Sequence, residues 1–143
     1  MNSQLKMVCG LIFNQDFTQI LLISKNRPIY LKNKLNGIGG KLEVNETSLQ
    51  AMMRECQEES GLIIEAKQWC HLGHFNNLSY ELDWFYCTLE NSHFDQYHSL
   101  TDEIVAKYKV EEILNDSLCL ASGVIYFTYQ SLLQNKKTAL HKN

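Results

Sequence analysis

Three glutamates lie within five consecutive positions near the middle of the chain, at Glu55, Glu58 and Glu59. On an α-helix each residue advances about 100°, so Glu58 and Glu59 would project within about 60° of Glu55. Like charges this close repel one another and destabilise a helix unless water or a cation screens them. Carboxylate oxygens suit Mg²⁺ or Mn²⁺ better than zinc. The spacing therefore favours a divalent-metal site, and the alternative is a solvated, charged helix face.

The residues around these glutamates predict the helix that would carry them. Thr47 and Gln50 have the spacing of a capping box, and Gly61 stands where a C-terminal cap is expected. Helical spacing also brings four apolar side chains onto one face that we expect to be buried: Leu49, Met52, Met53 and Cys56. We therefore expect a helix from near Thr47 to Gly61, with the glutamates beside or opposite its buried face.

Strand-like segments are found on both sides of this helix. Before it, Met7–Phe13 and Gln19–Ser24 are joined by turn residues and predict a β-hairpin. The polar stretch Lys25–Asn36 is expected to be a loop, and the glycine-rich stretch Asn36–Glu43 indicates a demanding backbone or a nearby ligand. After the helix we expect three further strands, at Trp69–Phe75, Tyr80–Leu89 and Ile104–Val110. A second helix is expected at Ala121–Gln134. This order favours a mixed α/β layered fold.

Composition narrows the class of protein. The 143 residues fit one domain, which we expect over residues 1–134, followed by a polar, disordered tail over residues 135–143. We find no apolar run of roughly 18 residues and no signal-peptide pattern, which favours a cytoplasmic protein without a membrane segment. The net charge of −3 argues against a nucleic-acid groove.

The cysteines favour neither a zinc site nor a disulfide framework. The five are scattered among apolar neighbours, and none forms a C-x-x-C pair. We therefore expect buried free thiols in a reducing compartment.

The glutamates also belong to a longer pattern. Gly40 is followed after five residues by Glu46, and after seven more by Arg54-Glu55-Cys56-Gln57-Glu58-Glu59-Ser60-Gly61-Leu62. This pattern resembles the box that defines the Nudix hydrolase superfamily, and it departs only at Cys56, where the family has an aliphatic residue. The resemblance implies an α/β/α sandwich with a central mixed β-sheet, and the MutT-type branch is the most similar.

The resemblance implies a metal site and a reaction. Glu55 and Glu59 match the principal metal-binding carboxylates, and Glu58 matches a third that binds metal or positions water. Gly40 begins the loop whose backbone helps to ligate the metal. The cofactor implied is Mg²⁺, with Mn²⁺ as a substitute, and the reaction is hydrolysis of a nucleoside diphosphate linked to another group.

Two further roles follow from the same resemblance. Glu46 and Arg54 match a structural ion pair that holds the loop onto the helix, which suits the fork of a guanidinium. The general base is either a glutamate of the box, such as Glu58, or a later carboxylate, for which Glu103 is the candidate. The alternative for Asp102-Glu103 is a polar turn.

Substrate candidates come from the entry to the box. Asn36, in the stretch that runs from Leu35 to Lys41, matches a base-contacting asparagine of members that cleave nucleoside triphosphates, including oxidised purine nucleotides; it could instead cap a turn. Lys25, Arg27 and Lys41 are candidates for phosphate contacts, or are solvated charges. The aromatic run Trp84–Tyr86 could stack on a base, although strand aromatics more often belong to the core.

Three hypotheses for the function follow from these observations. The first is hydrolysis of a nucleoside triphosphate to a monophosphate and pyrophosphate. The second is hydrolysis of ADP-ribose, a dinucleoside polyphosphate or a sugar nucleotide. The third is a nucleotide-binding regulator without catalysis, against which the intact glutamates argue. In each case the expected partner is a small nucleotide, and the chain is expected to be a monomer or a homodimer.

Overall fold

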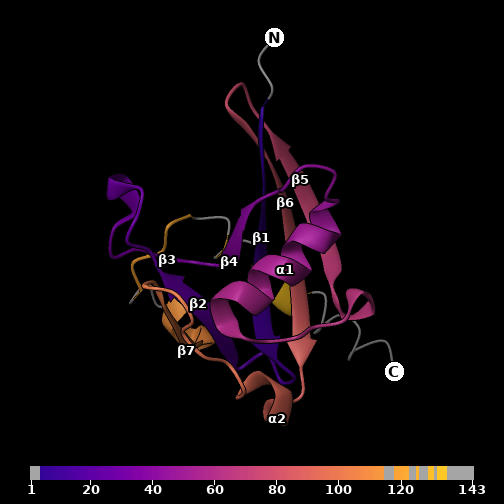
Figure 1. Ribbon diagram of the computed structural model, residues 1–143. Coiled ribbons are helices and arrows are strands. Elements are labelled where there is room, and N and C mark those ends of the chain that lie inside the picture. Colours follow the sequence, from indigo (N-terminus) through magenta and orange to yellow (C-terminus); the bar gives the residue numbers. More distant parts are fainter. Residues whose placement is uncertain (1–3, 115–117, 123–124, 126–128, 131, 135–143) are drawn as a thin grey trace.

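The computed structural model describes residues 4–114, 118–122, 125, 129–130 and 132–134 (Figure 1). Its strands are β1 Leu5–Asn14, β2 Gln19–Ser24, β3 Leu35–Asn36, β4 Ile38–Lys41, β5 Cys70–Asn76, β6 Tyr80–Leu89 and β7 Ile104–Lys109. Its helices are α1 Ser48–Ser60, α2 Asn91–Phe94 and α3 Val110–Leu114, with single 3-10 turns at Ile29–Leu31 and Ala66–Gln68. Among the described helices, none is long and apolar enough to cross a membrane.

The strands form one seven-stranded mixed sheet. The main path runs β3-β2-β1-β6-β5, with β4 paired to β1 and β7 paired to β2. Strands β1 and β6 run parallel along their whole length, from Leu5 opposite Tyr80 to Asn14 opposite Leu89. The other pairs are antiparallel, including the predicted hairpin of β1 and β2. The predicted α/β class with a central mixed sheet is confirmed.

The sheet is buried on both faces because β1 contributes apolar side chains to each. Val8 and Ile12 point to the core under α1, whereas Leu11 and Phe13 point to a second core on the opposite face. The second core also includes the α3 residue Ile113. The predicted helix over residues 121–134 lies partly outside the described residues, and so does the expected tail at 135–143.

Helix α1 begins and ends where the sequence predicts. The Thr47 side chain accepts a hydrogen bond from the Gln50 amide, and the Gln50 side chain accepts one from the Thr47 amide, so the capping box is complete. Gly61 ends the helix with a left-handed φ of 75°, a conformation that glycine adopts without strain. Met52 and Cys56 are buried against the sheet, as expected. A Cβ atom on Gly10 would lie 2.7 Å from the Met52 methyl, so β1 passes directly beneath α1.

Several expectations need correction. Leu35 and Asn36 form β3 and are not part of a loop, because they pair with Ile23 and Ser24 of β2. Val110 begins α3 and is not in the preceding strand. The prediction of buried thiols holds for three of the five free cysteines but is wrong for Cys70 and Cys119, which are exposed. Cys70 lies on β5, which is at one edge of the sheet and pairs only with β6 among the described strands.

Candidate metal centre

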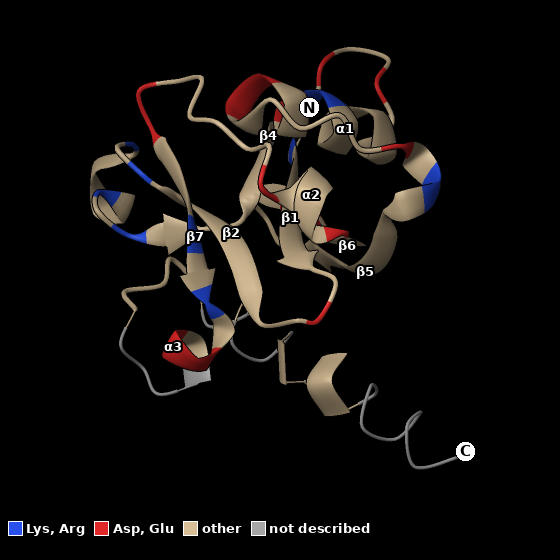
Figure 2. Cartoon of the chain, turned by 90° about the horizontal axis from the view of Figure 1, so that it is seen from below, with Lys and Arg blue, Asp and Glu red and all other residues tan. Residues whose placement is uncertain are grey.

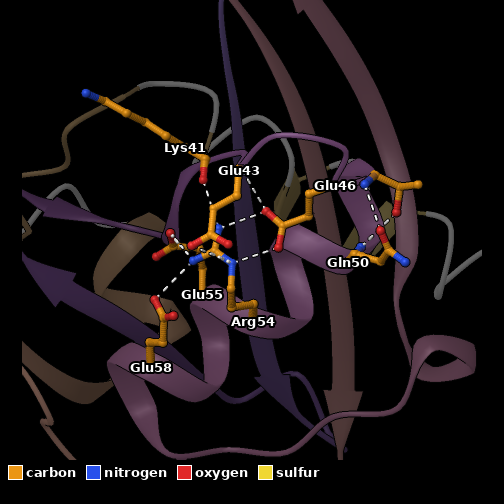
Figure 3. Close-up of polar contacts among 8 residues, drawn as sticks. Lys41, Glu43, Glu46, Gln50, Arg54, Glu55 and Glu58 are labelled. Atoms are coloured by element: carbon orange, nitrogen blue, oxygen red, sulfur yellow. Dashed lines mark hydrogen bonds and ion pairs between the residues drawn. The ribbon is translucent and has the colours of Figure 1, made fainter.

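Acidic residues of α1 and of the segment leading into β7 lie on the same side of the molecule (Figure 2). On α1, the Arg54 guanidinium stands among carboxylates that we call the Arg54 cluster: Glu43, Glu46, Glu55 and Glu58 (Figure 3). Its Nε and Nη2 atoms donate to the two oxygens of Glu46 at 2.7 and 2.9 Å. Nη2 also donates to the Lys41 carbonyl at 2.9 Å. This two-point contact is the geometry expected of a structural pair that ties the loop to the helix.

The electrostatics of the Glu46 pair follow from these contacts. The hydrogen bonds from Arg54 lower the pKa of Glu46 to about 2, with a smaller contribution from the Glu43 amide. The bonds to Glu46 also raise the pKa of Arg54, against the opposing effect of burial. Arg54 continues through Nη1 to Glu55 at 2.9 Å and to Glu58 at 3.1 Å. One cation therefore serves several anions, and the cluster keeps an excess of negative charge.

Gly40 and Glu55 are in direct contact. A Cβ atom at Gly40 would lie 2.6 Å from the Glu55 carboxyl carbon and from Oε1. Any larger residue would displace the carboxylate, so the absence of a side chain at Gly40 lets the β4 backbone lie against Glu55. The side chain of Glu55 is only 13% exposed. This places a largely buried carboxylate beside the backbone that, from the resemblance to the Nudix box, we expect to help bind the metal.

Glu59 is a second carboxyl group at the same place, and the charge of Lys25 offsets only part of the cost of its burial. Burial raises its pKa to about 8, and the neighbouring Glu55 adds to this through a hydrogen bond and through like charge. Its Oε2 atom is buried and has no hydrogen-bond partner among the described residues. A buried, unpaired oxygen next to a second carboxyl group is the donor set that a hard divalent cation fits.

Glu58 is placed differently from the other two glutamates. Its side chain is 55% exposed, and its Oε2 atom accepts the bond from Arg54. Within the described ranges, no three Asp, Glu, His or Cys side chains are arranged to hold one ion. The structure thus brings Glu55, Glu59 and Gly40 together and leaves Glu58 at the exposed side of Arg54.

Glu103 lies at the start of β7 as a buried, paired carboxylate. Its Oε1 accepts from the Lys25 amine at 2.9 Å, and its Oε2 accepts from the backbone amide of Asn26 at 2.7 Å. Burial alone would raise the pKa of Glu103, but these bonds and the Lys25 charge outweigh it and lower the pKa. Both Lys25 and Glu103 act electrostatically on Glu59, so this pair borders the glutamate site.

The remaining substrate candidates occupy separate positions. Arg27 pairs with Asp102 at the surface, where their side chains are 65% and 60% exposed. The Asn36 Oδ1 atom accepts from the Gly37 amide at 2.9 Å, and the buried Cys9 thiol lies 3.8 Å from the same oxygen. Lys41 contributes its backbone carbonyl to Arg54, while its amine points away from the Arg54 cluster (Figure 3).

A second polar group beside α1 was not predicted from the sequence. Asp83 of β6 binds Ser48 at the start of α1, together with His71 and His74 of β5; we call these four residues the Asp83 cluster. A signal was present in the alternation of β6, since Asp83 shares its inward phase with the buried Phe85 and Cys87. A carboxylate in the buried phase of a strand needs partners, and here they come from two other elements.

Comparisons with known proteins support one family. The model of the NUDIX domain matches residues 5–133. A curated relative, the 8-oxo-dGTP diphosphatase of Escherichia coli (strain K12), is 35% identical over 78 residues, which cover 54% of this chain and 56% of the relative. The match thus spans little more than half of the relative's length.

Solved structures agree with this match. One from a study of MutT from Aliivibrio salmonicida and Vibrio cholerae has a TM-score of 0.66 at 26% identity, over 79% of this chain and 86% of that one. A NUDIX-family hydrolase from Clostridium perfringens has a TM-score of 0.68 at 18% identity, over 93% and 98%. The NUDIX domain of Shewanella oneidensis NrtR, solved with ADP ribose, has a TM-score of 0.72 at 14% identity, over 98% and 90%. The last two show likeness of fold alone.

Proposed function

This chain belongs to the Nudix family, and from that premise we propose that it hydrolyses nucleoside triphosphates to a monophosphate and pyrophosphate with the help of Mg²⁺. The observation that carries the proposal is the carboxyl group of Glu55 against Gly40, with the buried carboxyl group of Glu59 beside it. Glu59 keeps a buried oxygen without a hydrogen-bond partner among the described residues. Such an oxygen is unfavourable in the protein alone and favourable next to a cation.

The residues that would hold Mg²⁺ or Mn²⁺ are Glu55, Glu59 and the backbone of Gly40, with Glu58 near them on α1. A bound divalent ion supplies positive charge that offsets the phosphate groups and makes water a better nucleophile. Arg54 holds Glu55 through Nη1 and so fixes one of these carboxylates in place. The protein's own contribution is thus an anionic site that is formed before the ion arrives.

Glu58 suits the removal of a proton from water better than Glu103 does. Glu58 is exposed and accepts from Arg54 through Oε2. Both oxygens of Glu103 already accept hydrogen bonds, from Lys25 and from the Asn26 amide, and its pKa is lowered. A carboxylate in that state is a weak base, so we assign Glu103 to holding Lys25 at the edge of the site.

Asn36 is the residue that we propose reads the base. Its Oδ1 atom accepts from the Gly37 amide, which fixes the orientation of the side chain and leaves the NH₂ group as the part that donates. The curated relative acts, by its name, on 8-oxo-dGTP, and this supports an oxidised purine nucleotide as the first substrate to test. The likeness to an ADP-ribose-bound NUDIX domain keeps ADP-ribose as the second candidate.

The proposed setting is the cytoplasm, where free nucleotides are present and thiols stay reduced. All five cysteines are free in the structure, which fits a reducing compartment. The net charge of −3 fits a small nucleotide that arrives with divalent cations better than it fits a nucleic acid.

A nucleotide panel tests the proposal. We would incubate the protein and Mg²⁺ with 8-oxo-dGTP, the ordinary nucleoside triphosphates, ADP-ribose and dinucleoside polyphosphates, and identify the phosphate products. The expected result is pyrophosphate release from a triphosphate, abolished by a chelator. Preferential cleavage of ADP-ribose would replace the first hypothesis with the second. Tight nucleotide binding without turnover at any divalent metal would indicate a regulator.

A further inference from the structure

The Asp83 cluster joins three elements through one carboxylate. The imidazoles of His71 and His74 on β5 donate to Asp83 Oδ1, through Nε2 at 2.8 Å and Nδ1 at 2.9 Å. The Ser48 hydroxyl, in the first turn of α1, donates to Asp83 Oδ2. Both carboxylate oxygens are therefore used, and the side chain of Asp83 is 19% exposed. The cluster connects the edge strand, a central strand and the start of the helix that carries the metal-binding glutamates.

These contacts are not needed to form the helix. The capping box of Thr47 and Gln50 already satisfies the Gln50 amide in the first turn of α1 and the Thr47 amide just before it, without any atom of Asp83. The buried face of α1, with Met52 and Cys56, holds the helix on the sheet. Apolar burial is not directional, so it permits the helix to slide or rotate over the sheet. A hydrogen bond between Ser48 and Asp83 is directional, and it fixes the position of the helix start.

We propose that Asp83 is a positioning residue for the metal centre, which sets the placement of α1 on the sheet through Ser48. This inference rests on the proposed function, because it concerns the site that Glu55 and Glu59 form. Asp83 acts at the junction where the loop from Gly40 meets the helix. The Arg54 cluster fixes the loop to the middle of α1, and Asp83 fixes the start of α1 to β6. Together the two contacts hold the site at both ends of the segment that contains it.

The surroundings of the cluster are polar and open to water. A hollow of about 280 Å³ borders it and is lined in part by Lys6, Glu46, Thr47 and Glu81. Glu81 lies 3.7 Å from the second ring nitrogen of His74. Burial by itself would raise the pKa of Asp83, but the bonds from Ser48 and the two histidines outweigh it and lower the pKa. The carboxylate is thus ionised at neutral pH and remains an acceptor for all three donors.

The main test is Ser48→Ala, which removes the contact to Asp83 and leaves the capping box intact. We expect kcat for the triphosphate to fall about tenfold, since small displacements of a site lower rates strongly, while KM for the nucleotide changes less than about twofold. The dissociation constant for Mn²⁺, measured by direct titration of the protein, should rise about threefold or more. Ser92→Ala, at an exposed serine of α2, is the matched control and should leave all three values unchanged.

Substitutions at Asp83 separate positioning from general stability. Asp83→Asn keeps an oxygen for both imidazoles and offers an NH₂ group to the Ser48 oxygen, so it should restore kcat to within about threefold of wild type. Asp83→Ala should lower kcat at least as much as Ser48→Ala. The double variant Ser48→Ala/Asp83→Ala should then lower kcat no further than Asp83→Ala alone, because both changes remove one contact. Additive losses would overturn the proposal.

The outcomes also separate this inference from the proposed function. Turnover of nucleotides by the wild type, with unchanged kcat and Mn²⁺ affinity in Ser48→Ala, would refute the positioning role and leave the function standing. No turnover by the wild type, with weaker Mn²⁺ binding in Ser48→Ala, would refute the function and support the positioning role.

Discussion

The two polar clusters beside α1 have opposite designs. In the Arg54 cluster one cation is surrounded by four carboxylates. In the Asp83 cluster one carboxylate is surrounded by three neutral or protonatable donors. The Asp83 cluster is therefore complete within the protein, whereas the Arg54 cluster keeps an excess of negative charge. This difference supports the proposals that a cation binds beside the Arg54 cluster and that the Asp83 cluster anchors the start of α1.

The largest expected effect comes from Glu59, which lies beside Glu55 of the Arg54 cluster. Its buried Oε2 atom has no hydrogen-bond partner among the described residues. We expect Glu59→Gln to lower kcat by about a thousandfold, because the change removes a proposed metal ligand. Its melting temperature without metal should stay the same or rise, since the change removes a buried carboxyl group with an unpaired oxygen. Turnover with Mg²⁺ and thermal melting by circular dichroism measure the two effects.

A matched control for that change is Glu65→Gln, at an exposed glutamate that caps the 3-10 turn Ala66–Gln68 and keeps an oxygen for that cap when it is changed to glutamine. It should alter neither turnover nor melting. Near-normal turnover in Glu59→Gln would show that the Glu59 carboxyl group has no part in the reaction.

The next effect concerns stability. Arg54→Ala leaves the Glu46, Glu55 and Glu58 carboxylates without their shared cation, and we expect the melting temperature to fall by roughly 6–10 °C. Arg54→Lys keeps the charge but loses the two-point contact with Glu46, so it should recover less than half of the fall. Equal melting temperatures of the alanine and lysine variants would show that the charge alone does not stabilise the fold without the two-point contact. An unchanged melting temperature in Arg54→Ala would show that the pair is not structural.

The fold around these clusters was predictable where the signals are local. The capping box, Gly61 and the spacing of Met52 and Cys56 fix α1 from neighbouring residues alone, and the structure has the helix there. Strand β4 was not recognised as a strand, since three glycines in four positions normally indicate a turn. It forms because its backbone lies close to β1, where a Cβ atom at Gly39 would lie 1.9 Å from the Val8 carbonyl oxygen.

The site was predictable only in its contiguous part. The motif located the glutamates and Arg54, because one helix and one loop carry them all. The Asp83 cluster joins residues that are 35 positions apart for Ser48 and Asp83, and it depends on the parallel pairing of β1 with β6. No local pattern encodes that pairing. The pairing of Lys25 with Glu103, across 78 positions, escaped prediction for the same reason.

A third test examines the stability that the Arg54 cluster provides in acid. The pKa of Glu46 is lowered to about 2, chiefly by its bonds to Arg54. A carboxyl group whose pKa is lowered by folding stabilises the fold above its unfolded pKa of about 4.3, and this contribution is lost as the pH falls toward 2. We therefore expect the melting temperature of the wild type to drop between about pH 4.5 and pH 2, and Glu46→Gln to show a shallower drop. A parallel curve for Glu46→Gln would show that folding does not lower the pKa of Glu46.

The smallest expected effect concerns a second guanidinium–carboxylate pair, which differs from Arg54 and Glu46 in how far its side chains are buried. Arg27 and Asp102 form the same guanidinium–carboxylate pair as Arg54 and Glu46, but their side chains are 65% and 60% exposed, against 21% and 12%. Water and salt screen an exposed pair, so Arg27→Ala should change the melting temperature by less than about 2 °C. The same variant tests phosphate binding. If Arg27 contacts the phosphate groups, Arg27→Ala should raise KM for a triphosphate without changing the melting temperature. A large fall in melting temperature would contradict the argument that burial, and not the number of ion pairs, makes Arg54 structural.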